Sequence, residues 1–133
     1  MKKIFLISLS LFFCSMLWGQ KFVPKKCTST VKSINSTYSP EKISKLDVIN
    51  FEFFWQNDDE TLTINFFNGV QNIPFNFNYQ KTVVDGDIQK KFFTWQYCDG
   101  TAIAIYIPKQ NRISFWNGQL GADGSKQFYH YYW

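Results

Sequence analysis

Apolar side chains recur at every second position over much of this sequence. The clearest stretch places Ile73, Phe75, Phe77 and Tyr79 at alternate positions, with proline or polar residues between them. Successive side chains of an extended strand point to opposite faces of a sheet, so this stretch has one apolar and one polar face. An amphipathic helix would instead repeat about every 3.6 residues. The pattern therefore predicts an all-β chain.

Turn signals separate the alternating segments. Glycine follows aspartate or asparagine at residues 68–69, 85–86, 99–100 and 117–118. Such pairs accept the positive φ that tight hairpin turns require, and strands joined by short turns pair in an antiparallel manner. Seven strands are predicted with a weaker eighth one at 27–34; the seven lie at 49–55, 62–66, 73–80, 88–98, 101–107, 112–117 and 126–133.

An antiparallel meander of seven or eight strands can close into a small up-and-down barrel or fold as a two-sheet β-sandwich. We favour the barrel, because closure removes the edge strands that an aromatic-rich sequence would otherwise expose. A lipocalin-like barrel is comparable in strand count alone, and its Gly-x-Trp motif is absent. One short helix is predicted at 40–46, because Ser39 can cap it and Pro40 suits its first position.

The N-terminus has the layout of a secretory signal peptide. Lys2 and Lys3 precede an apolar run at 4–17, which is shorter than the roughly 20 residues that span a bilayer. Cleavage after Gly19 would divide the chain into a leader, 1–19, and a single β domain, 20–133, that is secreted or periplasmic in a bacterium. The alternatives are an uncleaved anchor and a lipoprotein modified at Cys14.

The charge and the strand lengths exclude two classes of partner. The formal net charge is +4, and Lys2 and Lys3 would leave with the leader. The nearly balanced remainder has no clustered basic face, so no nucleic-acid partner is expected. Several predicted strands are shorter than the 9–11 residues that a membrane barrel requires, so no stable membrane insertion is expected.

Two cysteines, Cys27 and Cys98, remain after the predicted cleavage. An even number of cysteines in an exported chain favours a disulfide, so a bridge between these two is predicted. The alternative is a pair of reduced, buried thiols.

The sequence offers little for catalysis. His130 is the only histidine, and no nucleophile motif accompanies it. The acidic clusters at 58–60 and 85–87 lack the spacing of a calcium loop and are interpreted as turns. The protein is therefore not expected to be an enzyme, and no metal site or cofactor is predicted.

Aromatic residues make up 20% of the chain, and they supply the candidate binding residues. The leading hypothesis is an exported protein that holds a small apolar or aromatic molecule inside the barrel. Two alanines close together on one strand would leave space inside it. The predicted lining is Trp55, Phe75, Phe77, Trp95, Tyr97, Ala102 and Ala104.

A competing hypothesis uses the other face of the strands. Phe92, Tyr106 and Trp116 are out of phase with their apolar neighbours. If they lie outside the barrel, they form an exposed aromatic face of the kind that marks binding sites. The protein would then be a secreted structural or interaction protein that binds a protein or a glycan.

Overall fold

The structure is a computed structural model that describes residues 19–56 and 59–133. The predicted leader up to residue 18, with Cys14 inside it, lies outside the described residues. Asp58 of the predicted acidic turn also lies outside them.

The described chain forms ten strands in one antiparallel sheet, in the order β1-β4-β5-β6-β7-β8-β9-β10-β2-β3. Apart from one short 3-10 turn, η1 (Pro108–Gln110), the regular structure in this part of the chain is all strand. The strands are β1 (Gly19–Phe22), β2 (Lys26–Lys32), β3 (Lys42–Ser44), β4 (Ile49–Gln56), β5 (Asp59–Phe67), β6 (Asn72–Asp85), β7 (Ile88–Tyr97), β8 (Gly100–Ile107), β9 (Arg112–Trp116) and β10 (Lys126–Tyr132).

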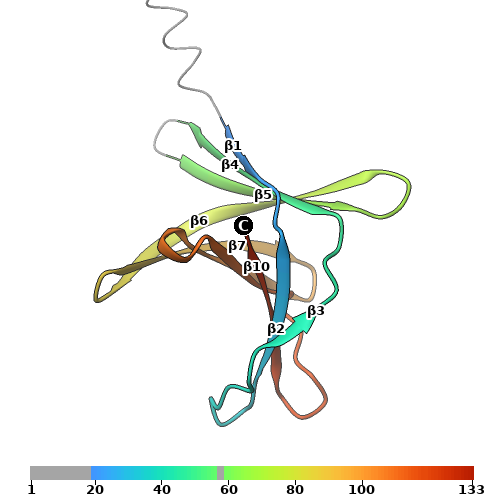
Figure 1. The fold of residues 1–133 in the computed structure, drawn as a ribbon, viewed down its shortest axis with the longest axis vertical. Helices are drawn as coiled ribbons and strands as arrows, with labels where there is room; N and C mark the ends of the chain where they lie inside the picture. The colour runs from blue at the N-terminus through green and yellow to red at the C-terminus, as the bar shows by residue number, and fades with distance from the viewer. Residues whose placement is uncertain (1–18, 57–58) are drawn as a thin grey trace, which may run out of the picture.

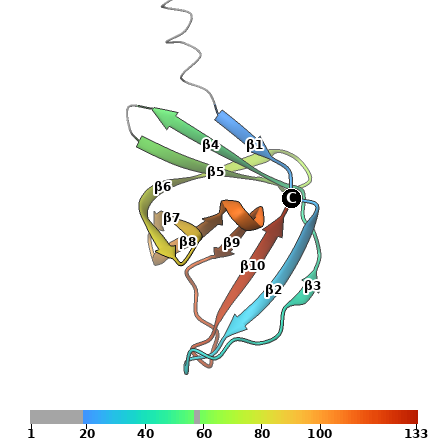
Figure 2. The same cartoon turned by 60° about the vertical axis from the view of Figure 1, so that its left-hand side comes forward.

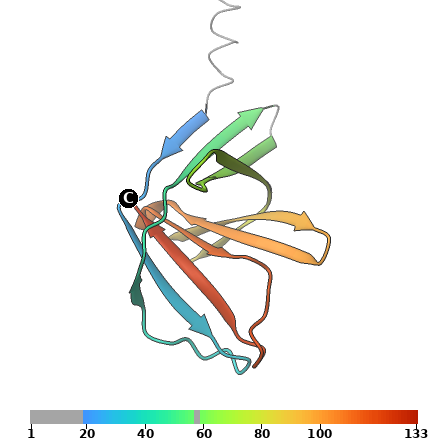
Figure 3. The same ribbon diagram turned by 90° about the vertical axis from the view of Figure 1, so that its right-hand side faces the viewer.

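β1, one end strand of this sheet, is joined by a short piece of chain to β2, the second strand from the other end. Only residues 23–25 separate β1, which pairs with β4, from β2, which pairs with β10. Next to this junction the backbone N–H of Lys25 donates to the carbonyl of Tyr132 at 2.7 Å, and the Trp133 ring stacks on Phe22. Figures 1 and 3 show the C-terminus beside the junction. The sheet is therefore curled into a barrel-like shape (Figure 2).

Alternation of side chains determines what the curled sheet encloses. Phe51 and Phe53 of β4 are buried, whereas Phe54 between Phe53 and Trp55 is 40% exposed. The same alternation continues through Leu62 and Ile64 of β5 and the strands that follow, so the concave face carries a core of interlocking rings. The predicted all-β antiparallel architecture is confirmed, and a single curled sheet replaces the two-sheet alternative.

The predicted strand count was too low. The eight predicted segments correspond to β2 and β4–β10, and β1 and β3 are additional. Both additional strands are short and pair along one side only, β1 with β4 and β3 with β2. Their residues show no apolar alternation of their own, because an edge strand of three or four residues buries few side chains.

The predicted helix at 40–46 is wrong. Lys42–Ser44 forms β3 instead. Ser39, which was expected to cap the helix, accepts a hydrogen bond at its Oγ from the backbone N–H of Val31 at 2.9 Å, and its own N–H donates to the Val31 carbonyl. An isolated helix of seven residues is marginal in water, so pairing with the free edge of β2 prevails.

The predicted disulfide is also wrong, since Cys27 and Cys98 are both free thiols. The strand register explains why they cannot meet. Starting from Cys27, paired positions lead across β10, β9 and β8 to Lys91 on β7. Cys98 lies seven residues beyond Lys91, a displacement of roughly 20 Å along the strand direction. A disulfide requires Cα atoms within about 7 Å.

Candidate binding site

A cavity of about 170 Å³ opens at the end of the sheet where the β5–β6, β7–β8 and β9–β10 loops lie. We call it the mouth cavity. Nearly all of its wall is aromatic or aliphatic, and Asn117 is the one amide residue that lines it. The lining residues are Phe66, Phe75, Phe77, Trp95, Ala102, Phe115 and Asn117.

Strand register brings these residues together. Trp95 and Ala102 are direct partners between β7 and β8, and the small alanine leaves the space beside the indole unfilled. The Trp95 ring meets Phe75 edge-on at a centroid distance of 5.0 Å, and Phe77 meets Phe115 edge-on at 6.1 Å. These edge-to-face contacts fix the ring orientations without filling the centre of the cavity.

The rim of the mouth cavity is built by a close approach of two loops. The Tyr97 hydroxyl donates to the carbonyl of Asn117 at 2.8 Å. Gly118 follows with φ +86°, and Gly100 also lies against the Tyr97 ring. A side chain at either glycine would press on this tyrosine, so the loop sequence positions Asn117 at the cavity edge.

Four of the seven residues predicted to bind a ligand line the mouth cavity: Phe75, Phe77, Trp95 and Ala102. Tyr97 lies at the rim beside Trp95, with ring centroids 5.4 Å apart. The other two predicted residues lie elsewhere. Ala104 is fully buried in the core, and Trp55 stacks on Phe53.

Three lining residues were not predicted: Phe66, Phe115 and Asn117. The signal for the two phenylalanines is present in the sequence, because Phe66 shares its face with Ile64, and Phe115 shares its face with Ile113. Assigning the whole apolar face to the interior would have found both. Asn117 belongs to a turn signal, and its place depends on a loop conformation that the periodicity does not encode.

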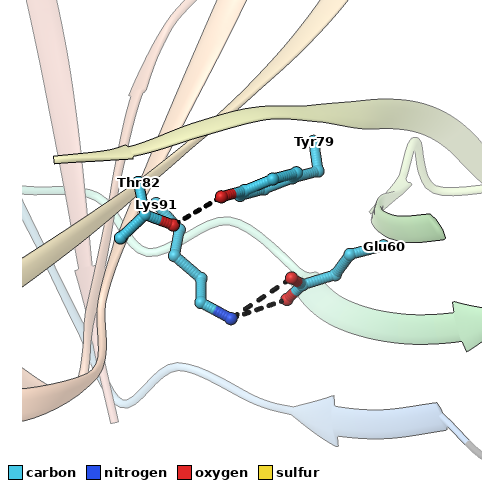
Figure 4. A network of polar contacts seen from close by, with 4 residues as sticks. All are labelled: Glu60, Tyr79, Thr82 and Lys91. Atoms are coloured by element: carbon cyan, nitrogen blue, oxygen red, sulfur yellow. Dashed lines mark hydrogen bonds and ion pairs between the residues drawn. The ribbon is translucent and has the colours of Figure 1, made fainter. Parts of the chain in front are cut away.

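Further along the concave face the interior becomes polar. Glu60 of β5 and Lys91 of β7 face one another, with Lys91 Nζ 3.2 Å from each carboxylate oxygen (Figure 4). The Tyr79 hydroxyl bonds to Thr82 Oγ1 above this pair, across the bulge in β6. Burial and the charge of Glu60 both raise the pKa of Tyr106. The mouth cavity therefore lies at the apolar end of the concave face.

The outer residues of the competing hypothesis do not form one patch. Phe92 and Trp116 lie on the convex face, where Lys81 covers the Phe92 ring and Lys126 covers Trp116. Tyr106 lies inside, packed against Phe22, Phe53 and Trp133. The expected outward position of Tyr106 is wrong. Tyr106 lies at alternate positions of β8 with Ala102 and Ala104, which face the core, so its side chain points to the same face.

The convex face carries a second cavity, of about 430 Å³, which we call the outer cavity. It lies over β7, β8, β9, β10 and β2 beside the segment that precedes β3. Its lining residues with polar groups are Thr30, Tyr38, Glu41, Lys90, Arg112, Ser114 and His130.

His130 is held between two hydroxyls in the outer cavity. Ser114 Oγ lies 2.6 Å from its Nδ1, and Thr30 Oγ1 lies 2.8 Å from its Nε2. Burial and the nearby Arg112 charge lower the pKa of His130, which Glu41 offsets only in part. The pKa of Glu41 is itself lowered, because the Thr28 and Tyr132 hydroxyls donate to its carboxylate.

Acidification from pH 7 to pH 5 is expected to destabilise the protein through His130. The unfolded chain binds the proton near the ordinary pKa of 6.5, and the folded protein binds it only at lower pH. The contribution of His130 to the free energy of unfolding is fully present above pH 6.5, and it is lost as the pH drops toward the pKa of the folded state. Urea unfolding at both pH values measures the loss. His130→Asn keeps a hydrogen-bond partner for Ser114 but cannot bind the proton, so its free energy of unfolding should fall much less between pH 7 and pH 5 than that of the wild type. An equal fall in this variant would contradict the prediction.

Within residues 19–56 and 59–133, no group of three or more His, Cys, Asp or Glu residues is arranged to hold a metal ion. In the same part of the chain, no helix has the length and hydropathy to cross a membrane. Comparison with known proteins adds no relative: no family model, curated protein or solved structure matches this chain.

Proposed function

We propose that this is an exported binding protein that holds a small apolar or aromatic group in the mouth cavity. The observation that carries the proposal is the cavity itself, an unfilled space among five aromatic rings at an accessible end of the curled sheet. An apolar space of about this size can stay dry and accept a benzene-sized molecule.

The volume limits the ligand. Pockets for drug-sized molecules hold about 300–1,000 Å³, so a cavity of about 170 Å³ accommodates a single ring or a short branched chain. Burying about 150 Å² of ring surface at roughly 25 cal/mol per Å² gives about 4 kcal/mol. This corresponds to a dissociation constant near 1 mM. The ring is therefore expected to be the anchoring end of a larger molecule, oriented by Asn117 at the rim.

Ala102→Leu is expected to abolish binding at the mouth cavity, because the larger side chain fills the space beside Trp95. The probe is toluene, added to isotope-labelled protein, and the readout is the indole N–H resonance of Trp95. In the wild-type protein this resonance should shift with a millimolar dissociation constant for toluene. In Ala102→Leu the affinity for toluene should be at least tenfold lower. Ile103→Leu, one position away and facing out, is the matched control and should bind as wild type. Absence of any wild-type shift at saturating toluene would refute the proposal.

Export is the second part of the proposal, and it is supported by the basic and apolar N-terminal pattern. Gly19, the predicted last residue of the leader, is the first residue of β1. Cleavage there would leave Gln20, Lys21 and Phe22 to pair with β4. Expression of the full chain in a bacterium followed by N-terminal sequencing of the extracytoplasmic fraction should give Gln20 as the first residue. Recovery of the intact chain in the cytoplasm would contradict it.

The alternative function, recognition of a protein or glycan by an outer aromatic face, has less support. Trp116 is the one ring of the predicted set with an outer aromatic neighbour, Phe128, at a centroid distance of 6.5 Å. Its indole N–H donates to the Gln119 carbonyl at 2.9 Å.

A further inference from the structure

The outer cavity differs in chemistry from the mouth cavity. It is larger, at about 430 Å³, which lies within the range of pockets that enclose whole small molecules. Charged and hydroxyl side chains form one part of its wall. Ile105, Ile107 and Phe128 form an apolar part. A ligand that complements both parts must have a polar or charged end and an apolar body.

Arg112 is the group in this wall whose hydrogen-bonding needs are unmet. Its Nε is removed from solvent and has no hydrogen-bond partner, and it is the only such buried side-chain atom found within residues 19–56 and 59–133. A buried donor without a partner is destabilising. The guanidinium fork matches a carboxylate, which can accept two parallel N–H bonds from it.

His130 and Glu41, two other polar groups of the wall, already have hydrogen-bond partners. His130 is bonded to Ser114 and Thr30, and the lowered pKa keeps its ring neutral at pH 7. The Glu41 carboxylate accepts hydrogen bonds from Thr28 and Tyr132. Lys90 adds a second positive charge to the lining. Counting Arg112, Lys90 and Glu41, the cavity carries one net positive charge, which a monoanion would balance.

From this geometry we propose that the outer cavity binds a small organic acid, with its carboxylate paired to Arg112 and its apolar body on Ile105, Ile107 and Phe128. This site is separate from the mouth cavity, and it stands whether or not the mouth cavity binds a ligand. The side chain of Arg112 sets the preference for the acid, and the neutral Ser114–His130 pair adds no charge beside it.

The test compares hexanoate with hexanol, which share an apolar body and differ in the charged end. Backbone amide resonances of Ser114 and His130 report the outer cavity, and those of Ala102 and Phe115 report the mouth cavity. Hexanoate should shift the first pair with at least tenfold higher affinity than hexanol. Equal affinity for the two probes, or shifts confined to Ala102 and Phe115, would overturn the proposal. The titration is repeated in Ala102→Leu, in which the mouth cavity is filled. Hexanoate binding at the outer cavity should persist in this variant, whether or not the mouth cavity of the wild type binds a ligand.

Two variants test the role of the guanidinium. Arg112→Gln should weaken hexanoate binding at least tenfold, whereas Lys21→Gln, which removes the same charge at β1, should leave it unchanged. Lys21 is the matched control because it is exposed and paired with Glu52. If Arg112→Gln fails to fold, Arg112→Lys still keeps the charge and loses the fork, and a severalfold loss is expected. Unchanged affinity in the folded Arg112 variant, or inorganic phosphate binding as tightly as hexanoate, would refute the carboxylate assignment.

Discussion

Replacing Phe53 with alanine is expected to lower the free energy of unfolding by about 3–5 kcal/mol. Phe53 is 1% exposed, and its ring contacts Phe22, Phe93 and Tyr106. The substitution removes apolar surface that was buried and leaves a cavity that rigid neighbouring rings cannot fill. Urea or guanidinium denaturation, monitored by circular dichroism, measures the change. The affected region joins β1, β4, β7 and β8, so the loss should appear in a single cooperative transition.

The neighbouring residue provides the control. Phe54 is the same residue type on the same strand, but it points to the convex face and is 40% exposed. Phe54→Ala is expected to cost about 1 kcal/mol or less. A difference of at least 2 kcal/mol between these two variants follows directly from the two-residue alternation. Similar losses at both positions would contradict the assignment of the concave face as the core.

Gly118→Ala is expected to destabilise the protein by about 2–4 kcal/mol. Gly118 has φ +86°, and a Cβ there would lie 2.5 Å from the carbonyl oxygen of Thr101 and 2.9 Å from the Tyr97 hydroxyl oxygen. The positive φ alone costs an alanine about 1–2 kcal/mol, and the backbone of β8 cannot move away without breaking its pairing. Thermal or chemical denaturation gives the magnitude. The displaced loop should also weaken toluene binding at the mouth cavity.

Gly69→Ala separates the cost of a positive φ from the cost of the steric clash. Gly69 has φ +96°, yet nothing lies within 4 Å of a Cβ at this position. It should therefore show only the conformational cost, about 1–2 kcal/mol. If Gly118→Ala were no worse than Gly69→Ala, the close approach between the β9–β10 loop and the start of β8 would be wrong.

The strands were predictable because each carries its own signal. The predicted segment 88–98 corresponds to β7 (Ile88–Tyr97), and 112–117 corresponds to β9 (Arg112–Trp116), so in these two strands the two-residue period locates the ends to within one residue. The period cannot place strands that bury little, which is why β1 and β3 were missed. It also stops short of Asp85 at the end of β6, where the last eight residues are exposed on both faces.

The binding residues were predictable only in part, for a related reason. The alternation of side chains along each strand assigns Phe75, Phe77, Trp95 and Ala102 to one face of the sheet, and the mouth cavity lies on that face. The outer cavity depends on register between β9, β10 and β2, which pairs Ser114 with His130 and brings Thr30 alongside. No local pattern encodes contacts between residues that are 100 positions apart. Tyr106 was misplaced although its parity with Ala104 was visible.

The junction between β1 and β2 determines when the structure can be completed. β2, the first long strand to be synthesised, pairs with β10, the last strand of the sheet to be synthesised. The contact between them spans 100 residues. Topologies dominated by such distant pairings fold slowly, in milliseconds to seconds. Until β10 has emerged from the ribosome, β2 would therefore have only the short strand β3 as a partner. If the chain is exported as proposed, the pairing of β2 with β10 would be completed only after translocation.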